Sequence, residues 1–188
     1  MRQLSFALLC AFVFSYPAAA QSPAEPIVRY DALTHPEYGR FGMVAAQNRL
    51  SSEVGAAVLA EGGNAIDAAV AVGFSLAVTL PRAGNLGGGG FMLIHDASND
   101  ESIAIDYRER APRRATRDMY LDTDGNVDRQ LSMFSHMAAG VPGTVAGLYL
   151  AHQEYGSLPW ERLLQPAIEQ ARNGIEVSFD LATLLSRR

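Results

Sequence analysis

Four consecutive glycines, Gly87–Gly90, restrict how this chain can fold more than any other feature of its sequence. They lie between an apolar run that ends at Pro81 and a second apolar run that begins at Phe91. A glycine within a helix or strand costs roughly 0.5–1 kcal/mol relative to alanine. The run therefore indicates backbone that takes positive φ angles or that packs closer to its neighbours than a side chain permits. Its position predicts a turn that joins a buried helix to a core strand.

A phosphate-binding loop is the alternative interpretation of these glycines. The dinucleotide-binding fingerprint requires glycines at positions i, i+2 and i+5, and no register across residues 84–90 supplies them. The run also precedes a strand pattern, whereas phosphate-binding loops precede a helix. A structural turn with close backbone packing is therefore the favoured interpretation.

Residues 1–20 have the pattern of a secretory signal peptide. Arg2 supplies a positive start, Leu4–Tyr16 is apolar, and Ala18–Ala20 offers a small-residue cleavage site after Ala20. The apolar run is too short to span a membrane. We therefore expect an exported protein, either periplasmic or secreted.

Cysteine and lysine are missing from the chain beyond this segment. The single cysteine, Cys10, is removed with the signal peptide, and the 15 basic residues are all arginine, against 20 acidic residues. These residues therefore exclude disulfides, thiolate metal sites and a catalytic lysine. The net charge of −5 provides no attraction for nucleic acid or for an anionic membrane surface. The four histidines lack the spacing of metal ligands, so we expect neither a metal nor a cofactor.

Apolar periodicity and capping residues predict a mixed order of helices and strands. An extended lead-in over residues 21–39 precedes a partial domain over residues 40–188. A helix that is apolar on every face, capped by Asn64 and ended by Pro81, is expected to be wholly buried. The other expected elements are a strand over Gly42–Ala46, a helix capped by Ser51 or Ser52 and stopped by Gly62–Gly63, a hairpin of a buried strand Phe91–His95 with Ser102–Tyr107, and helices over Pro142–Tyr155, over Pro159–Asn173 and from Ser178. The last helix reaches Arg188 without a stop signal, which predicts a truncated protein.

The segment Asp106–Arg117 carries the candidate binding residues. Five arginines fall within ten residues, and a guanidinium group is a planar fork that binds a carboxylate through two parallel hydrogen bonds. Arg108 follows the second strand of the hairpin directly, where rigid support lets a side chain point into a cleft. The alternative is a solvated face balanced by Asp106, Glu109 and Asp118. Spacing alone does not decide between the two.

Two other patterns are better explained by structure than by chemistry. Asp122–Asp128 resembles a calcium loop, but its glycine is at the fourth position and not at the sixth, which favours a polar turn. Ser75 lies within the buried helix, in a sequence that lacks the last glycine of the nucleophile elbow. We therefore expect neither a calcium site nor a serine nucleophile.

Several longer motifs occur in one unbroken order across roughly residues 40–180. They are Glu61–Ala69, Gly84–Met92, Asp106–Glu109, Thr116–Met119 and Gly140–Gly147. Together they resemble the γ-glutamyltranspeptidase (glutathione hydrolase) family. Several long motifs in one order are a much stronger signal than any one motif alone.

The resemblance implies an α+β fold, the four-layer αββα sandwich of N-terminal-nucleophile hydrolases, of which this chain would be an N-terminal fragment. In this family a precursor cuts itself into a large and a small subunit. The new N-terminal threonine of the small subunit attacks the γ-glutamyl amide of glutathione. The acyl group then passes to water or to an amino acid or peptide acceptor. The arginine of the Asp-aromatic-Arg-Glu motif holds the substrate α-carboxylate, a role that falls on Arg108.

The same resemblance implies that the catalytic residues lie elsewhere. The nucleophilic threonine is expected beyond Arg188, no threonine of this chain is assigned that role, and the chain alone is expected to be inactive. Within the same class, the alternative is an exported acylase of the glutaryl-cephalosporin type. In a different class, the alternative is a non-catalytic exported protein that binds γ-glutamyl compounds.

Overall fold

The structure is a computed structural model, and it describes residues 38–187. The predicted signal peptide, its cleavage site and most of the predicted lead-in lie outside the described residues. The elements follow in the order α1 (Arg49–Ala60), α2 (Ala65–Thr79), β1 (Phe91–Asp96), β2 (Glu101–Asp106), α3 (Arg129–Phe134), the 3-10 helix η1 (His136–Ala138), α4 (Thr144–Tyr155), α5 (Trp160–Asn173) and α6 (Phe179–Ser186). Within the described part of the chain, none of the helices combines the length and the apolar composition that a membrane crossing requires.

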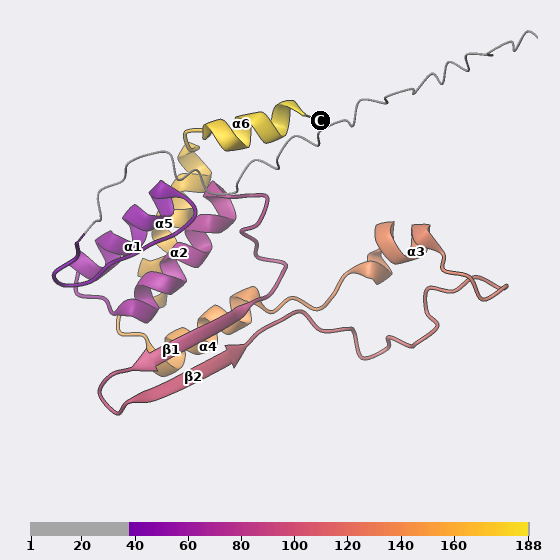
Figure 1. The fold of residues 1–188 in the computed structure, drawn as a ribbon, viewed down its shortest axis with the longest axis horizontal. Helices are drawn as coiled ribbons and strands as arrows, with labels where there is room; N and C mark the ends of the chain where they lie inside the picture. The colour runs from indigo at the N-terminus through magenta and orange to yellow at the C-terminus, as the bar shows by residue number, and fades with distance from the viewer. Residues whose placement is uncertain (1–37, 188) are drawn as a thin grey trace, which may run out of the picture. The chain divides into compact units, whose positions relative to one another are not determined.

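Helix α2 is the centre of the helical layer, and it packs against α1, α4 and α5 (Figure 1). Its buried side chains meet those of the neighbouring helices in one apolar core, made up of Val58, Ala68, Val70, Ala71, Phe74, Leu148, Leu163 and Ala167. The ring of Phe74 meets Trp160 edge to face at a centroid distance of 5.5 Å. Burial of these side chains is the main favourable contribution to the stability of the layer.

The prediction that this helix is wholly buried is wrong for one face. Val72, Gly73 and Leu76 are only partly buried. They line an apolar pocket of about 620 Å³, to which Met43 and Met92 also contribute. Leu148 of α4 reaches Gly73 on this face, and the pocket leaves the rest of the face partly open, so an all-round apolar pattern does not mean complete burial here.

Helix α2 starts at the predicted cap, Asn64, which the structure shows to be part of a capping box. The Asn64 side chain accepts hydrogen bonds from the Ile66 and Asp67 amides, at 2.8 and 3.0 Å, and Asp67 accepts from the Asn64 amide. Asp67 is also fully buried and accepts hydrogen bonds from the amides of Ser157 and Leu158 and from the Ser157 hydroxyl. One carboxylate therefore ties the start of α2 to the connection between α4 and α5.

Helix α1 begins earlier than the sequence pattern predicts. Asn48 caps it by accepting from the Leu50 amide at 2.9 Å, so the predicted caps Ser51 and Ser52 lie within the helix. The predicted stop is confirmed: the chain leaves the helix through a turn in which Gly62 has a φ of 94°. Residues 42–46 form no strand, because no described strand pairs with them, although their burial alternates along the chain as it does in a strand.

Ser51 is instead part of a chain of buried hydrogen bonds between α1, α2 and α5. Its hydroxyl lies 2.8 Å from that of Ser75 and 2.7 Å from that of Thr79. Ser75 donates to the Gln170 Oε1 atom at 2.8 Å. Because each hydroxyl has one proton, Ser51 must donate to Ser75, and Thr79 must donate to Ser51. The position of Ser75 in this chain explains why a serine lies in an apolar helix.

We expect Ser75→Ala to lower the free energy of unfolding by about 1–3 kcal/mol, because it leaves Ser51 without an acceptor and Gln170 without a donor. The matched control is Ser186→Ala, which removes an exposed hydroxyl that bonds only the Thr183 carbonyl among the described residues. Urea denaturation of the full-length protein measures both changes. Equal effects of the two substitutions would contradict the importance of the buried chain.

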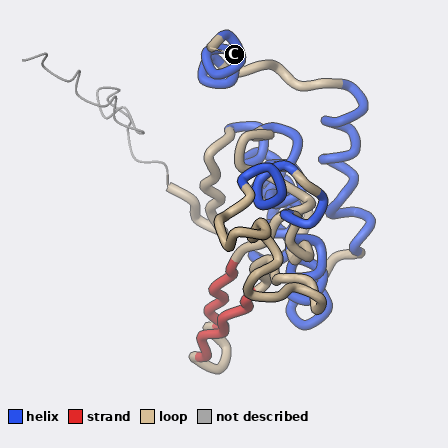
Figure 2. The backbone as a smooth tube through the Cα atoms, turned by 90° about the vertical axis from the view of Figure 1, so that its right-hand side faces the viewer, coloured by secondary structure: helices blue, strands red, loops and turns tan. Residues whose placement is uncertain are grey.

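The predicted hairpin is present, with β1 antiparallel to β2 from the Phe91–Asp106 pair to the Asp96–Glu101 pair. Its first strand is less buried than predicted: Ile94 is 8% exposed, whereas Leu93 is 85% exposed. Met92 and Ile94, on one face of β1, are partly and fully buried, whereas Phe91, Leu93 and His95, on the other face, are exposed. Figure 2 shows the tip of the hairpin beyond the ends of the helices.

The later helices agree with the sequence pattern except in two places. Helix α5 follows Pro159, and α6 is capped by Ser178, as predicted. Helix α4 begins at Thr144, two residues after the predicted Pro142, for a reason that is given with the site below. The short helices α3 and η1 are not predicted by the sequence pattern; they lie to one side of the helical layer, in the excursion between Arg110 and Val141 (Figure 1).

Candidate functional site

The glycine run lies directly behind the backbone of residues 107–109. A Cβ atom on Gly89 would lie 2.5 Å from the Tyr107 carbonyl oxygen and 2.7 Å from the Glu109 amide nitrogen. On Gly90 it would lie 2.8 Å from the Tyr107 ring, whereas on Gly87 it would meet no atom within 4 Å. None of the four glycines has a positive φ. Close packing is therefore the reason for the run, and the predicted structural turn between α2 and β1 is confirmed.

The carbonyl of Gly88 takes the place of an N-cap for α4. The helix has no side-chain cap at Gly143, and the Gly88 oxygen accepts from the amides of Gly143 and Thr144, at 2.7 and 3.0 Å. These amides are among those that a helix start leaves without partners in the helix. The helix therefore begins where the glycine loop reaches it, after Pro142.

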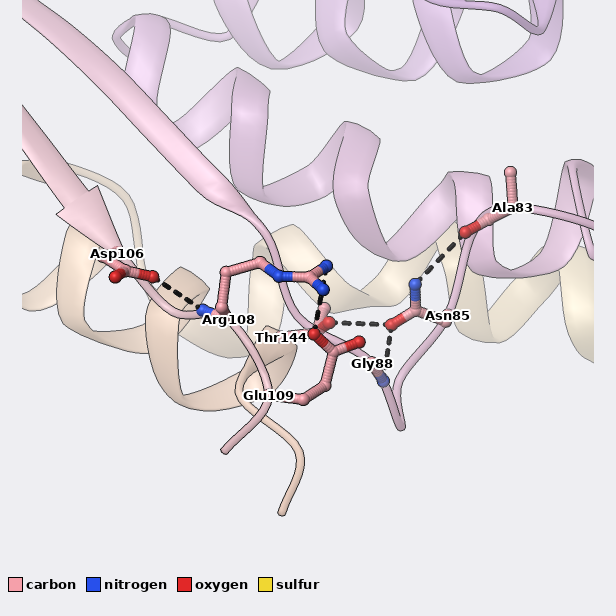
Figure 3. A network of polar contacts seen from close by, with 7 residues as sticks. All are labelled: Ala83, Asn85, Gly88, Asp106, Arg108, Glu109 and Thr144. Atoms are coloured by element: carbon pink, nitrogen blue, oxygen red, sulfur yellow. Dashed lines mark hydrogen bonds and ion pairs between the residues drawn. The ribbon is translucent and has the colours of Figure 1, made fainter. Parts of the chain in front are cut away.

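Asn85 connects the same loop to α4 through its side chain (Figure 3). Its Oδ1 atom accepts from the Gly88 amide at 2.7 Å and from the Thr144 hydroxyl at 2.8 Å. Its Nδ2 atom donates to the Ala83 carbonyl at 3.1 Å. The motif contains Asn85, but nothing in the sequence pairs it with Thr144, which follows 59 residues later.

Tyr107 anchors the segment that leaves β2. Its amide donates to the Gly90 carbonyl at 3.0 Å, which extends the hairpin by one more pair. Its ring packs on Gly147 of α4, where a Cβ atom would overlap it. Burial raises the pKa of the Tyr107 hydroxyl, so the side chain is neutral at physiological pH. The segment is thereby held between the glycine loop and α4.

Arg108 leaves this rigid segment one residue after Tyr107, at the end of β2. Its amide donates to the Asp106 carboxylate at 3.0 Å, and its Nη1 atom lies 3.1 Å from the Glu109 Oε2 atom. Figure 3 shows the guanidinium group pointing toward that carboxylate. The side chain is 57% exposed, so it is accessible to a further anion.

A pocket of about 230 Å³ lies between this segment and α4. Arg108 and Arg110 line it from one side, and Gly143, Ala146 and Leu150 line it from the other. The backbone of Arg110 also pairs with that of Val141, which holds the two sides together. The structure thus places Arg108 at a pocket, as the strand-end argument predicts, and places a second arginine beside it.

The other arginines of the segment are not brought to this pocket. Arg113, Arg114 and Arg117 are exposed, and Arg117 lies 3.6 Å from the carboxylate of its neighbour Asp118. The interpretation of a solvated face therefore holds for these three. Arg108 and Arg110 line the pocket and are also exposed, so a binding role for them stays a prediction.

The other two candidates from the sequence, the loop Asp122–Asp128 and Ser75, have structural roles in the described part of the chain. Asp122 uses its carboxylate to accept from the amides of Asp124 and Asn126, which confirms a polar turn. No cluster of three or more metal-ligating side chains is found in residues 38–187. Ser75 is fully buried in α2, as described above, which agrees with the rejection of a serine nucleophile.

Comparison with known proteins decides the family. Residues 51–188 match the sequence model described as Gamma-glutamyltranspeptidase. The chain belongs to the γ-glutamyltranspeptidase family. A glutathione hydrolase proenzyme of Escherichia coli is 52% identical over 179 residues, which cover 94% of this chain and 30% of that protein. The chain therefore spans about a third of the length of this relative.

Solved structures of γ-glutamyltranspeptidases agree with this assignment. The Helicobacter pylori enzyme matches with a TM-score of 0.77 and 49% identity, over 81% of this chain and 44% of that one. A cephalosporin acylase from Bacillus halodurans is more distant, with a TM-score of 0.60 and 27% identity over 83% of this chain and 30% of that one. The predicted family and the predicted α+β fold of N-terminal-nucleophile hydrolases are confirmed, and the described residues contribute helices and one hairpin to that fold.

Proposed function

We propose that the full-length protein is a γ-glutamyltransferase that also hydrolyses glutathione. The observation that carries this proposal is Arg108, in the Asp-Tyr-Arg-Glu motif of this family, held rigidly at the edge of a pocket with its guanidinium group exposed. The match to a glutathione hydrolase proenzyme at 52% identity supports the same activity and a precursor that is cut into two subunits. The signal-peptide pattern of residues 1–20 supports export.

In this proposal the described residues bind and orient the donor substrate. Arg108 receives the α-carboxylate of the γ-glutamyl group in a charge-assisted, bidentate pair. Binding at this end places the γ-carbonyl at a fixed distance for attack, which converts part of the binding energy into orientation. Glu109 keeps the guanidinium group directed toward the pocket edge through its ion pair.

The bond changes follow from the chemistry of an N-terminal threonine. The hydroxyl of a small-subunit threonine forms an ester to the γ-carbonyl carbon, its proton passes through the free amine of the same residue to the leaving nitrogen, and the amide bond breaks. Water then yields glutamate, or the amine of an amino acid or peptide yields a new γ-glutamyl amide. No residue of this chain is assigned a covalent role.

Arg108→Ala tests the binding role directly in the full-length protein. We expect a rise of about 30- to 150-fold in KM for a chromogenic γ-glutamyl amide, because a charge-assisted hydrogen-bonded contact contributes about 2–3 kcal/mol. The matched control is Arg117→Ala, an exposed arginine of the same segment, for which we expect an unchanged KM. An unchanged KM for Arg108→Ala would overturn the assignment.

Two measurements separate this function from an acylase and from a binding protein: the preferred acyl group of the substrate, and whether the precursor is cleaved. Faster release from a glutaryl amide than from a γ-glutamyl amide would identify an acylase, which only the more distant structural match supports. Binding of glutamate by calorimetry without cleavage of the precursor would identify a binding protein. We expect a cleaved precursor and a preference for the γ-glutamyl amide.

A further inference from the structure

The backbone of residues 107–109 sets where the Arg108 side chain starts, and the ion pair with Glu109 directs its guanidinium group. Its side chain is more than half exposed, and Glu109 is its ion-pair partner among the described residues. The backbone of residues 107–109, in contrast, is in close contact with the glycine loop on one side and with α4 on the other. Whatever holds these two surfaces together therefore also holds the backbone from which the side chains of Arg108 and Glu109 both start.

The glycines show how tightly the two surfaces are fitted. Gly89 contacts residues 107–109 from the loop side, with backbone atoms at the distances given above. Gly143 contacts them from the α4 side, where an added Cβ atom would overlap the Tyr107 carbonyl. Neither surface leaves room for the segment to shift while the other stays in place.

Asn85 is the side chain that joins the two surfaces. One oxygen accepts both the Gly88 amide, which belongs to the loop, and the Thr144 hydroxyl, which belongs to α4. The amide group occupies the space that a Cβ on Gly88 would need, with the Asn85 Cγ atom 2.7 Å from that position. The Thr144 hydroxyl is largely buried, so its acceptor cannot be replaced by bulk water without rearrangement.

We propose that Asn85, together with Thr144, is a positioning residue for Arg108. Asn85 keeps the glycine loop closed on α4, and the closed pair holds the backbone from which Arg108 and its partner Glu109 reach the donor carboxylate. This inference rests on the proposed function, since it assigns to Asn85 an effect that is exerted only through Arg108.

Asn85→Ala in the full-length protein is the first test, and the exposed position of Asn85 makes the substitution compatible with folding. We expect KM for the γ-glutamyl donor to rise about tenfold while kcat changes less than about threefold, because the loss is in orientation of the binding group. Asn85→Asp keeps both acceptor contacts but sets a carboxylate oxygen against the Ala83 carbonyl in place of the Nδ2 donor, so it should recover part of the affinity. Melting temperature and the fraction of cleaved precursor are measured for each variant.

A double-mutant cycle separates a positioning role from a general structural role. In the Arg108→Ala background, Asn85→Ala should change KM by less than about twofold, because its effect has no remaining target. If Asn85→Ala raises KM by the same factor with and without Arg108, the inference is overturned. It is also overturned if Arg108→Ala raises KM but Asn85→Ala alone leaves KM unchanged. If Arg108→Ala itself leaves KM unchanged, the proposed function and this inference both fall.

Thr144 provides a second, independent pair of variants. Thr144→Val preserves the shape and removes the hydroxyl, and we expect the same selective rise in KM, whereas Thr144→Ser should reverse most of it. Thr183→Val is the matched control, because it removes a hydroxyl that bonds the Phe179 carbonyl on α6. If Asn85→Ala reduces cleavage of the precursor, the inference is tested with the two Thr144 variants instead. Equal KM values for Thr144→Val and Thr144→Ser would then overturn it.

Discussion

Gly89→Ala is expected to lower the stability of the protein by more than about 3 kcal/mol and to remove most of its activity. A Cβ atom at this position would lie within 2.5–2.8 Å of three backbone atoms, of Tyr107, Arg108 and Glu109. Backbone atoms cannot move aside as a side-chain end can, so the hairpin extension or the loop must separate. Because Arg108 lies at the point of contact, the loss of stability and the loss of donor binding should appear together.

Gly87→Ala is the matched control for this substitution. It lies in the same run, has no atom within 4 Å of the added Cβ and has no positive φ, so we expect a change within about 0.5 kcal/mol. Melting temperature, precursor cleavage and KM for the γ-glutamyl amide compare the two variants. Similar results for Gly87→Ala and Gly89→Ala would show that the run acts through chain flexibility and not through packing.

Asp67→Ala is expected to lower the free energy of unfolding by about 3–5 kcal/mol. The carboxylate accepts from the amides of Asn64, Ser157 and Leu158 and from the Ser157 hydroxyl, and the substitution leaves all of these donors without their acceptor in a buried place. Asp180→Ala is the matched control, because Asp180 also lies in the first turn of a helix but is exposed. A comparable loss for the two variants would contradict a special role for the buried carboxylate.

The same carboxylate predicts a dependence of stability on pH. Burial is the strongest single influence on the pKa of Asp67 and raises it, but the hydrogen bonds from Ser157, Asn64 and Leu158 together outweigh burial, so the pKa is lowered in the folded protein. A lowered pKa contributes stability that is complete above the pKa of the unfolded chain, near 3.8. This contribution is lost as the pH falls through the folded pKa.

Urea denaturation between about pH 2 and pH 6 tests this dependence. The unfolding free energy of the unchanged protein should fall on the acid side of about pH 4, and Asp67→Asn should remove part of that fall, because the amide does not titrate in this range. Asp180→Asn provides the control for a carboxylate at an exposed helix start. An identical pH dependence for Asp67→Asn and the unchanged protein would contradict the assignment.

Local signals in the sequence predict the elements whose causes lie within a few residues. The caps at Asn64 and Ser178, the stop at Gly62 and the hairpin are all found where the pattern predicts them. Each depends on hydrogen bonds or backbone angles of neighbouring residues, which the order of residue types specifies directly. The motif that contains Arg108 is local in the same sense.

Burial and capping could not be predicted where the partner lies far away in the chain. Ser51 is a buried hydrogen-bonding residue and not a cap, because Ser75 and Thr79 face it from α2. Helix α4 begins at Thr144 because the carbonyl of Gly88 caps it from another loop. One face of α2 and one face of β1 are less buried than their apolar patterns predict, because burial depends on which elements cover a face.

The glycine run Gly87–Gly90 shows which of its properties follow from the sequence and which follow only from the tertiary structure. The sequence by itself determined that residues 87–90 form a turn between a helix and a strand, that they lack the dinucleotide-binding fingerprint, and that Arg108 follows the hairpin. It favoured a turn with close backbone packing but did not give the atoms that the glycines contact. Only the tertiary structure decided for packing, because the atoms that exclude a side chain belong to residues 107–109 and to α4, which the fold brings to the loop from later in the chain.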